Sequence, residues 1–283
     1  MNLCDWNELR TLLTRHGFHF SKSMGQNFLI DPAVPADIAA SSGAGADCGV
    51  LEIGPGAGCL TAELAQRAGK VVSVELDKAL LPVLAETMAP YPNVEILNAD
   101  VLRLDLAALA AEKFAGLRPL VCANLPYNIT SPVLTRLVET PCFECVTVLL
   151  QKEVAQRLAA PQGSGYGGAF TLFLQYHMET EVLFDVPPDR FQPRPKVTSA
   201  VLRCVRRERP AVAAEDEAFF FQVIQGAFFL RRKTLVNSLA AALPGCEKAD
   251  VQAALNACGL SETIRGERLT LDDFARLAAV LKN

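Results

Sequence analysis

The stretch from residue 50 to residue 68 constrains the fold more than any other part of the chain. Residues 50–53 form an apolar run, glycines follow at positions 54, 56 and 58, and residues 59–68 have the apolar period of a helix. A strand that turns through glycines into a helix brings backbone without side chains to the crevice at its carboxyl end. A nucleotide-like ligand can approach closely there, so we expect a nucleotide-type site at this turn.

Downstream of this turn the chain alternates expected strands with expected helices. The strands are continuous apolar runs without polar alternation, which favours a parallel sheet covered on both faces. We expect strands at 70–76, 93–97, 119–124 and 145–150, helices at 78–89, 104–115, 131–140, 152–160 and 168–178, and a closing antiparallel pair at 180–186 and 200–206. The pattern predicts an α/β protein with a Rossmann-like sheet.

The two ends of the chain are predicted to be helical. Residues 3–16 form an amphipathic stretch, and Asp31-Pro32 is a helix start that leads to a helix ending near Ser42. Residues 207–216 are rich in Arg, Pro, Ala and acidic residues, and helices are expected after them at 215–230, 232–242, 248–258 and 271–282. We therefore predict one domain at 1–207, with N-terminal helices in 1–45, and a small all-helical domain at 208–283.

The composition bounds the class of protein. Of the 283 residues 51% are hydrophobic and 20% charged, which is typical of a soluble globular protein. No apolar stretch reaches the roughly 18 residues of a membrane span, and the mixed charges of residues 5–15 suit neither a signal nor a transit peptide. The odd number of cysteines, nine, with one close pair and only three histidines, favours reduced thiols over a zinc site. We expect a cytoplasmic protein without a metal.

The charge is unevenly distributed. The whole chain carries −4, whereas residues 186–237 hold ten Lys or Arg and five Asp or Glu. Such a run is usually a solvated face, but it also marks a basic patch that could meet a polyanion.

Acidic residues follow the second and third expected strands. Glu75 ends the second strand, where a carboxylate can accept both hydroxyls of a ribose; the alternative is a surface acid at a strand end. Asp100, followed by Val101, comes after the third strand, where an acid could accept the exocyclic amine of an adenine. The spacing from Gly54 favours the ribose role for Glu75.

The turn after the fourth strand, Asn124-Leu125-Pro126-Tyr127, indicates methyl transfer to an aromatic amine. An adenine N6 amine is a poor nucleophile, because its lone pair is delocalised into the ring. The Asn124 side-chain oxygen and the Leu125 carbonyl can hold both N6 hydrogens, Pro126 fixes the turn, and Tyr127 offers a stacking face. Positioning for in-line displacement would then supply most of the catalysis. The alternative is a tight turn without chemical function.

These motifs together resemble the ribosomal RNA adenine N6,N6-dimethyltransferases, and most closely the bacterial small-subunit enzymes of the KsgA type. The resemblance runs from Gly25 to the C-terminus. It is carried by Gly25-Gln26-Asn27-Phe28-Leu29, Glu52-Ile53-Gly54-Pro55-Gly56-Ala57-Gly58, Val74-Glu75-Leu76-Asp77, Asn98-Ala99-Asp100, Asn124-Leu125-Pro126-Tyr127, Gln151-Lys152-Glu153-Val154-Ala155-Gln156-Arg157 and Phe191-x-Pro193-x-Pro195-Lys196-Val197-x-Ser199.

The resemblance implies an S-adenosylmethionine (SAM) domain and dimethylation of two adjacent adenosines near the 3′ end of 16S rRNA, in a 30S assembly intermediate, by a monomeric enzyme. It implies that SAM is contacted by Asn27, Leu29, Gly54, Gly56, Glu75, Asp100, Val101 and Asn124, and the target base by Asn124, Leu125, Tyr127 and Phe191. Residues 1–45 would include a cofactor lid. Phe191 would be a second stacking platform, the alternative being a hydrophobic plug between strands.

The basic patch supplies candidates for phosphate contacts, and the chain departs from the family pattern at two places near it. The candidates are Arg194, Lys196, Arg231, Arg232 and Lys233. The loop 163–169 lacks the Lys or Arg that family members tend to carry, and Val236 occupies a position where a basic residue is usual.

Three other readings stay open on the sequence. An Erm-type enzyme would perform the same chemistry on 23S rRNA, although the segment 264–270 is more similar to the KsgA side. A relative that lost catalysis would use the fold for binding in ribosome assembly. A dinucleotide-dependent oxidoreductase would share the glycine turn, and binding of SAM rather than NAD would exclude it.

Overall fold

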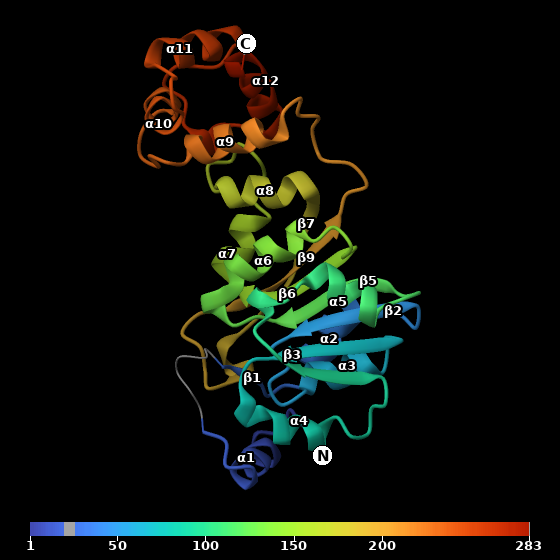
Figure 1. The fold of residues 1–283 in the computed structure, drawn as a ribbon. Helices are drawn as coiled ribbons and strands as arrows, with labels where there is room; N and C mark the ends of the chain where they lie inside the picture. Colours follow the sequence, from blue (N-terminus) through green and yellow to red (C-terminus); the bar gives the residue numbers. More distant parts are fainter. Residues whose placement is uncertain (20–25, 283) are drawn as a thin grey trace. The chain divides into compact units, whose positions relative to one another are not determined.

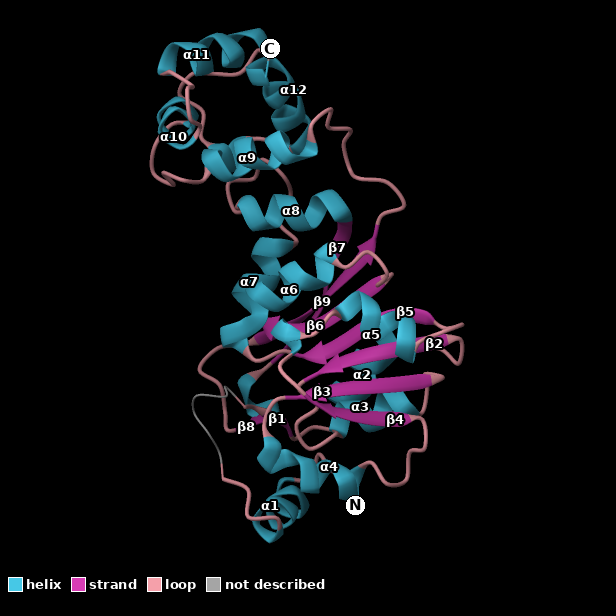
Figure 2. Ribbon diagram, viewed as in Figure 1, coloured by secondary structure: helices cyan, strands magenta, loops and turns pink. Residues whose placement is uncertain are grey.

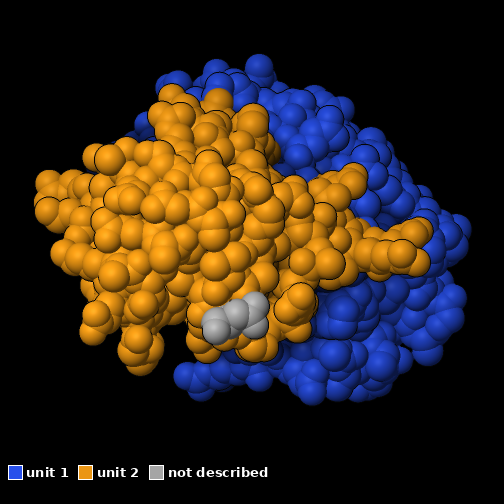
Figure 3. All heavy atoms as spheres, turned by 90° about the horizontal axis from the view of Figure 1, so that it is seen from above, with its two compact units in different colours: residues 1–155, 180–206 blue, residues 156–179, 207–283 orange. Residues whose placement is uncertain are grey.

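The computed structural model describes residues 1–19 and 26–282, which form two compact units. Unit 1 comprises residues 1–155 and 180–206, and unit 2 comprises residues 156–179 and those from 207 onward; Figure 3 colours them separately. Gly25, the first residue of the expected Gly-Gln-Asn-Phe-Leu motif, lies outside the described residues. Each unit is described by itself below.

Unit 1 is built on a seven-stranded sheet with the strand order β4-β3-β2-β5-β6-β9-β7. The strands are β2 (Cys48–Ile53), β3 (Lys70–Glu75), β4 (Val94–Asn98), β5 (Arg118–Asn124), β6 (Cys145–Gln151), β7 (Met178–Val186) and β9 (Ser199–Arg206). The five strands β4, β3, β2, β5 and β6 run parallel to one another, and β9 pairs antiparallel with β6. The expected Rossmann-like sheet is thus confirmed. The strand order reverses between β2 and β5, and ligands of such sheets bind beside that point.

Helices cover both faces of this sheet (Figures 1 and 2). They are α2 (Ala33–Ser41), α3 (Cys59–Ala65), α4 (Leu81–Thr87), α5 (Leu106–Lys113), α6 (Thr130–Glu139) and α7 (Lys152–Leu158). Every residue of β2 is buried, as expected for a strand with helices on both sides. Helix α2 begins at Ala33, one residue after the expected Pro32. The side chain of Asp31 accepts a hydrogen bond from the Ala33 amide at 3.0 Å.

The N-terminal helix α1 (Trp6–Arg15) is part of the core of unit 1. Asp5 caps it by accepting hydrogen bonds from the amides of Asn7 and Glu8. Its buried face, Leu9, Leu12 and Leu13, packs in one cluster with side chains of α4 and of the short helix before it. Helix α1 does not line the ligand cavity described below, whereas Asn27 and Leu29 do.

A two-stranded antiparallel sheet joins β1 (Phe28–Leu29) to β8 (Phe191–Gln192). Phe28 pairs with Gln192 and Leu29 with Phe191, and the pairing continues through a 2.9 Å hydrogen bond from the Ile30 amide to the Arg190 carbonyl. Neither strand was expected, because two-residue strands carry no periodic signal. The pairing holds the segment at Asn27 beside the loop that contains Phe191.

Unit 2 is helical and includes more of the chain than predicted. Its helices are α8 (Ala169–His177), α9 (Glu217–Ala227), α10 (Leu235–Ala242), α11 (Lys248–Ala257) and α12 (Leu271–Lys282). The prediction placed residues 156–179 in the first domain, but Leu172 and Tyr176 on α8 are buried in the same core as Phe220 of α9 and Leu235 of α10. The Tyr176 hydroxyl also donates to Glu217 at 3.1 Å. The boundary differs because these contacts are long-range and leave no local signal.

Three findings bear on the composition arguments. No helix among the described residues is long and apolar enough to cross a membrane. All nine cysteines are free thiols. Within residues 1–19 and 26–282 there is no group of three or more His, Cys, Asp or Glu side chains that could hold a metal ion.

Candidate active site

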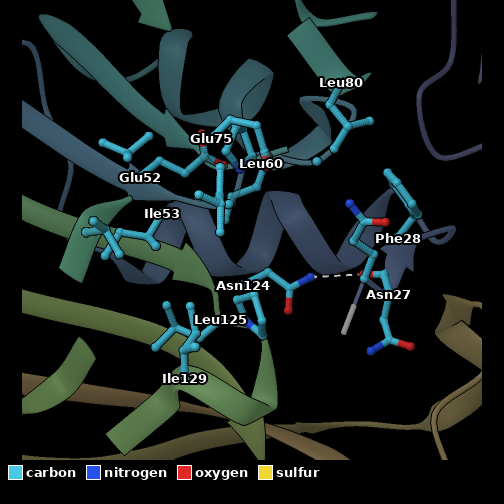
Figure 4. A pocket seen from close by; sticks show the side chains of 18 of the residues that line it. Asn27, Phe28, Glu52, Ile53, Leu60, Glu75, Leu80, Asn124, Leu125 and Ile129 are labelled. Carbon is cyan, nitrogen blue, oxygen red and sulfur yellow. Dashed lines mark hydrogen bonds between the residues drawn. The ribbon is translucent and has the colours of Figure 1, made fainter. Parts of the chain in front are cut away.

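A cavity of unit 1 lies at the carboxyl ends of β2, β3 and β5, where the strand order reverses. Its volume is about 230 Å³, and Figure 4 shows it from close by. The lining includes every residue that the sequence assigned to SAM, namely Asn27, Leu29, Gly54, Gly56, Glu75, Asp100, Val101 and Asn124, together with Leu125 and Tyr127 from the expected target-base site. The sequence therefore predicted residues that lie around one cavity, although they come from five separate segments.

The glycine turn after β2 forms the floor of this cavity. Gly54 and Gly56 have φ angles of +70° and +61°, a conformation that favours glycine. A Cβ atom added at Gly56 would lie 3.4 Å from the ring of Phe28, and one at Gly54 would lie 3.8 Å from Pro126. The turn is therefore packed between β1 and the turn after β5, and its backbone faces the cavity without side chains.

Glu75 stands at the end of β3 with its carboxylate at the cavity. It is 6% exposed, and its Oε1 accepts a hydrogen bond from the Asp77 amide at 2.7 Å. Burial raises the pKa of the Glu75 carboxyl, while the backbone amides of Asp77, Gly56 and Leu76 oppose this shift by stabilising the anion. A carboxylate fixed in this way can accept hydrogen bonds from vicinal hydroxyl groups.

Asp100 lies at the end of β4 and caps the short helix η3 (Val101–Arg103). Its Oδ1 accepts the Leu102 amide at 3.0 Å, and its Oδ2 lies 3.4 Å from Nε of Arg103. Asn98 supports this corner, because its side-chain nitrogen donates to the Glu75 carbonyl at 2.8 Å. Glu75 and Asp100 thus lie at the ends of neighbouring strands that Asn98 joins.

The turn after β5 presents two hydrogen-bond acceptors. The Asn124 side-chain nitrogen donates to the Asn27 carbonyl at 3.2 Å, so the Asn124 oxygen points to the other side (Figure 4). Leu125 donates its amide to the Leu149 carbonyl at 3.1 Å, and within the described residues its own carbonyl accepts no hydrogen bond. The arrangement leaves two oxygen acceptors on adjacent residues of one rigid turn.

Tyr127 follows in the same turn and is held by its hydroxyl. The Tyr127 and Ser199 oxygens are 2.6 Å apart, which ties the turn to the start of β9. Partial burial raises the pKa of the Tyr127 phenol, with the Ser199 hydrogen bond acting in the opposite direction. Tyr127 is therefore a neutral, oriented ring at the cavity wall.

The comparisons with known proteins agree with this geometry. Residues 17–282 match the family model described as ribosomal RNA adenine dimethylase. The chain belongs to that family. It is 47% identical over 276 residues, 96% of this chain and 94% of the relative, to a protein named ribosomal RNA small subunit methyltransferase A from Geobacillus thermodenitrificans (strain NG80-2). A protein of the same name from Bacillus mycoides (strain KBAB4) is 43% identical over 279 residues, 97% of this chain and 96% of the relative.

Solved structures resemble this dimethylase over most of the chain. The 23S rRNA methyltransferase ErmE matches with a TM-score of 0.71 and 29% identity, over 90% of this chain and 100% of ErmE. A dimethyladenosine transferase from Plasmodium falciparum matches with a TM-score of 0.73 and 23% identity, over 88% and 95% of the two chains, which shows the shared fold. The two relatives named as small-subunit methyltransferases are 47% and 43% identical to this chain, whereas ErmE is 29% identical.

Phe191 lies elsewhere than the other predicted base-site residues of the dimethylase. It is 1% exposed, packs in a hydrophobic cluster of unit 1 and does not line the cavity. Its neighbours in that cluster include Leu29, Ile38 and Val201. The surroundings of the Phe191 ring are those of a hydrophobic plug, the alternative to a stacking platform. The ring can stack on a base only after it is uncovered.

The predicted phosphate contacts are exposed. Arg194 and Lys196 follow β8 in unit 1, and the other three, Arg231, Arg232 and Lys233, lie between α9 and α10 in unit 2. Among the described residues none of the five forms an ion pair. Val236 is 6% exposed and belongs to the core of unit 2. A basic side chain at that position would have to extend out of the core to keep its charge in solvent.

Sequence reasoning missed several lining residues. Glu52 is the most consequential: it is 1% exposed, and its Oε2 accepts hydrogen bonds from Thr61 Oγ1 at 2.7 Å and Ser73 Oγ at 2.6 Å. Burial raises the pKa of Glu52 to about 7 despite these two hydroxyls, with the charge of Glu75 adding to the rise. A lone acid inside an apolar strand was the signal that could have identified it.

Gln26 is a second missed residue, at the opposite wall. Its Nε2 donates to Asp77 Oδ2 at 2.8 Å, while its Oε1 is buried and has no hydrogen-bond partner among residues 1–19 and 26–282. An orphaned acceptor on a cavity wall suits a ligand that brings a donor.

Proposed function

We propose that this dimethylase transfers methyl groups from SAM to N6 of two adjacent adenosines near the 3′ end of 16S rRNA, as a monomer that acts on a 30S assembly intermediate. One observation carries the proposal: the Asn124–Tyr127 turn and the glycine turn line the same cavity. A nucleotide-type cofactor and an aromatic amine would therefore meet at one place. The names of the similar sequences support the small subunit as the source of the substrate.

The cavity residues suit SAM. The bare backbone of Gly54 and Gly56 gives space that a Cβ would fill, and the Gln26 oxygen lacks a donor. Glu75 would accept the ribose hydroxyls, Asp100 the adenine amine, and the Val101 backbone the edge of the ring. When bound, SAM supplies a methyl group on a positively charged sulfur, and the acids that line the cavity include Glu52 and Glu75.

The target amine would be held by the turn after β5. The Asn124 oxygen and the Leu125 carbonyl would accept the two N6 hydrogens, which favours a tetrahedral nitrogen with its lone pair directed away from the ring. Tyr127 would stack on the extruded base, held by its hydrogen bond to Ser199. Because N6 becomes acidic once it is methylated, no strong base is required, and the chain contributes chiefly orientation.

The exposed cations would hold the RNA. Arg194 and Lys196 in unit 1, and Arg231, Arg232 and Lys233 in unit 2, would contact phosphates and make binding fall steeply with salt. Phe191 would take part only if the loop after β8 uncovers its ring.

The decisive experiment is mass spectrometry of rRNA nucleosides after incubation of the protein with SAM. The substrates are 30S and 50S particles from a strain that lacks these dimethyladenosines. Dimethyladenosine in 16S rRNA alone is the expected result. Product in 23S rRNA would place the chain with the Erm-type enzymes, and SAM binding without any product would mean that the fold serves binding alone.

A further inference from the structure

The turn between α9 and α10 exposes one aromatic ring beside three cations. Phe228 packs against the core of unit 2, whereas Phe229, the next residue, is 64% exposed. Ser238 holds the turn in this form: its hydroxyl donates to the Gly226 carbonyl at 2.7 Å and accepts the Leu230 amide at 2.9 Å. Phe229 is therefore presented to solvent by a fixed backbone, directly before Arg231, Arg232 and Lys233.

A second exposed ring lies in the glycine-rich loop that lacks its own cations. Tyr166 is 78% exposed, between Gly165 and Gly167. Arg268, from the short helix η6 (Gly266–Arg268), lies over this loop and donates from Nη1 to the Ser164 carbonyl at 3.2 Å. A Cβ at Gly165 would lie 3.1 Å from the Arg268 guanidinium carbon, so the glycine makes room for it. Arg268 thus supplies to the loop the positive charge that its sequence omits.

The chain neighbours of the two rings line the same small cleft of unit 2. The cleft is lined by Gly167 of the loop and Phe228 of the turn, the immediate neighbours of Tyr166 and Phe229. Gly266, at the start of η6, packs so closely under α9 that a Cβ there would lie 3.0 Å from the Ala227 carbonyl oxygen. The loop, η6 and the turn therefore form one surface, made of segments that are distant in sequence.

The composition of this surface is unusual for the molecule. Tyr166 and Phe229 are the two aromatic side chains among residues 1–19 and 26–282 that are largely exposed. In the same part of the chain Arg268 has no ion-pair partner, as is true of Arg231, Arg232 and Lys233. Isolated exposed apolar residues need no explanation, but two rings beside four unpaired cations match the arrangement that binds unpaired nucleotides.

We propose that this surface, defined by Tyr166, Phe229 and Arg268, binds an unpaired segment of the rRNA substrate. Bases stack on the two rings, and Arg268 contacts a phosphate beside them. The assignment rests on the proposed function, since it takes rRNA as the substrate. It adds a binding element that reads single-stranded character, where phosphate contacts alone would accept any RNA.

The test is binding of the full-length protein to two labelled RNAs at several salt concentrations. One is a transcript of the 3′-terminal part of 16S rRNA with its unpaired segments, and the other is a fully paired duplex of equal length. Phe229→Ala and Tyr166→Ala are each expected to weaken binding to the first RNA at least about fivefold and to leave duplex binding unchanged. Val280→Ala, an exposed apolar side chain on α12, is the matched control.

Arg268 is tested by the salt dependence. Arg268→Ala should reduce the slope of log Kd against log salt by about 0.7, the share of one phosphate contact on a single strand. Arg268→Lys should keep that slope, although it loses the hydrogen bond to Ser164, which separates charge from a structural role. Lys248→Ala, at an exposed cation of α11, is the control.

The outcomes separate this assignment from the proposed function. Aromatic variants that bind the transcript within twofold of the parent, or that lose affinity for both RNAs equally, would overturn the assignment, as would an unchanged slope in Arg268→Ala. Variants that bind both RNAs normally but fail to modify 30S particles would assign the surface to a ribosomal protein, and would overturn it too. Failure of the proposed function would instead appear as absence of dimethyladenosine with the parent protein.

Discussion

Replacing Glu52 by Gln should stabilise unit 1 at neutral and alkaline pH. Glu52 is 1% exposed and its pKa is raised to about 7, mainly by burial. Its ordinary value is 4.5. Between these two values the unfolded chain has released the proton while the folded protein still binds it, so the free energy of unfolding falls as the pH rises. The loss in free energy of unfolding is absent below about pH 4.5 and complete above about pH 7.

The size of the effect follows from the shift in pKa. Each unit corresponds to about 1.4 kcal/mol, so ionised Glu52 lowers the free energy of unfolding by roughly 3 kcal/mol. A glutamine at this position keeps an oxygen that can accept from both Thr61 and Ser73, and it carries no charge. We therefore expect the free energy of unfolding of Glu52→Gln to exceed that of the parent by about 3 kcal/mol at pH 8.5 and by less than about 1 kcal/mol at pH 5.

The assay is urea unfolding of both proteins from pH 5 to 8.5 without cofactor. Trp6, the single tryptophan, lies in the core cluster of α1 and α4, so its fluorescence reports the unfolding of unit 1. Glu139→Gln, at an exposed carboxylate of α6, should show no pH-dependent gain. A difference between Glu52→Gln and the parent that stays the same at pH 5 and pH 8.5 would refute the reasoning, because only an ionisation can make the gain depend on pH.

Three further predictions concern the cavity. Asn124→Ala should lower kcat at least about 100-fold, because it removes one of the two acceptors for N6, while the Kd for SAM measured by calorimetry changes less than tenfold; turnover at the parent rate would remove Asn124 from that role. Glu75→Ala should weaken SAM binding about 10- to 100-fold, since hydrogen bonds to a charged group are lost, and an unchanged Kd would contradict the ribose assignment. Gly56→Ala should cost about 1–2 kcal/mol of stability, because φ is +61° there, and thermal unfolding at the parent temperature would show that the turn relaxes freely.

Much of the site could be predicted because parallel strands end at one edge of their sheet. Gly54, Glu75, Asp100 and Asn124 each follow an apolar run, and once the runs are taken as neighbouring strands their carboxyl ends must meet. No pairwise distance was needed for that conclusion. The helices between the strands were also predicted, apart from shifts of a few residues at their ends.

What could not be predicted depends on contacts between distant segments. The β1–β8 pairing and the membership of 156–179 in unit 2 arise from partners more than 30 residues away. The cluster that buries Phe191 likewise includes the distant residues Leu29 and Ile38. The loop 163–169 is a further case. Its sequence shows only that it lacks Lys and Arg, whereas in the structure the guanidinium of Arg268 lies against Gly165. A local pattern shows which residue is absent and cannot show which distant residue takes its place.

The β1–β8 pairing also relates the two halves of the site to each other. The Asn27 carbonyl accepts the Asn124 side-chain nitrogen and so orients the oxygen that would face the target amine. Two residues later, Leu29 pairs with Phe191. One short segment thus lines the cofactor cavity, sets the rotation of Asn124 and holds the loop of Phe191. Because one segment makes all of these contacts, a cofactor bound against it would orient the base site at the same time, without a separate conformational step.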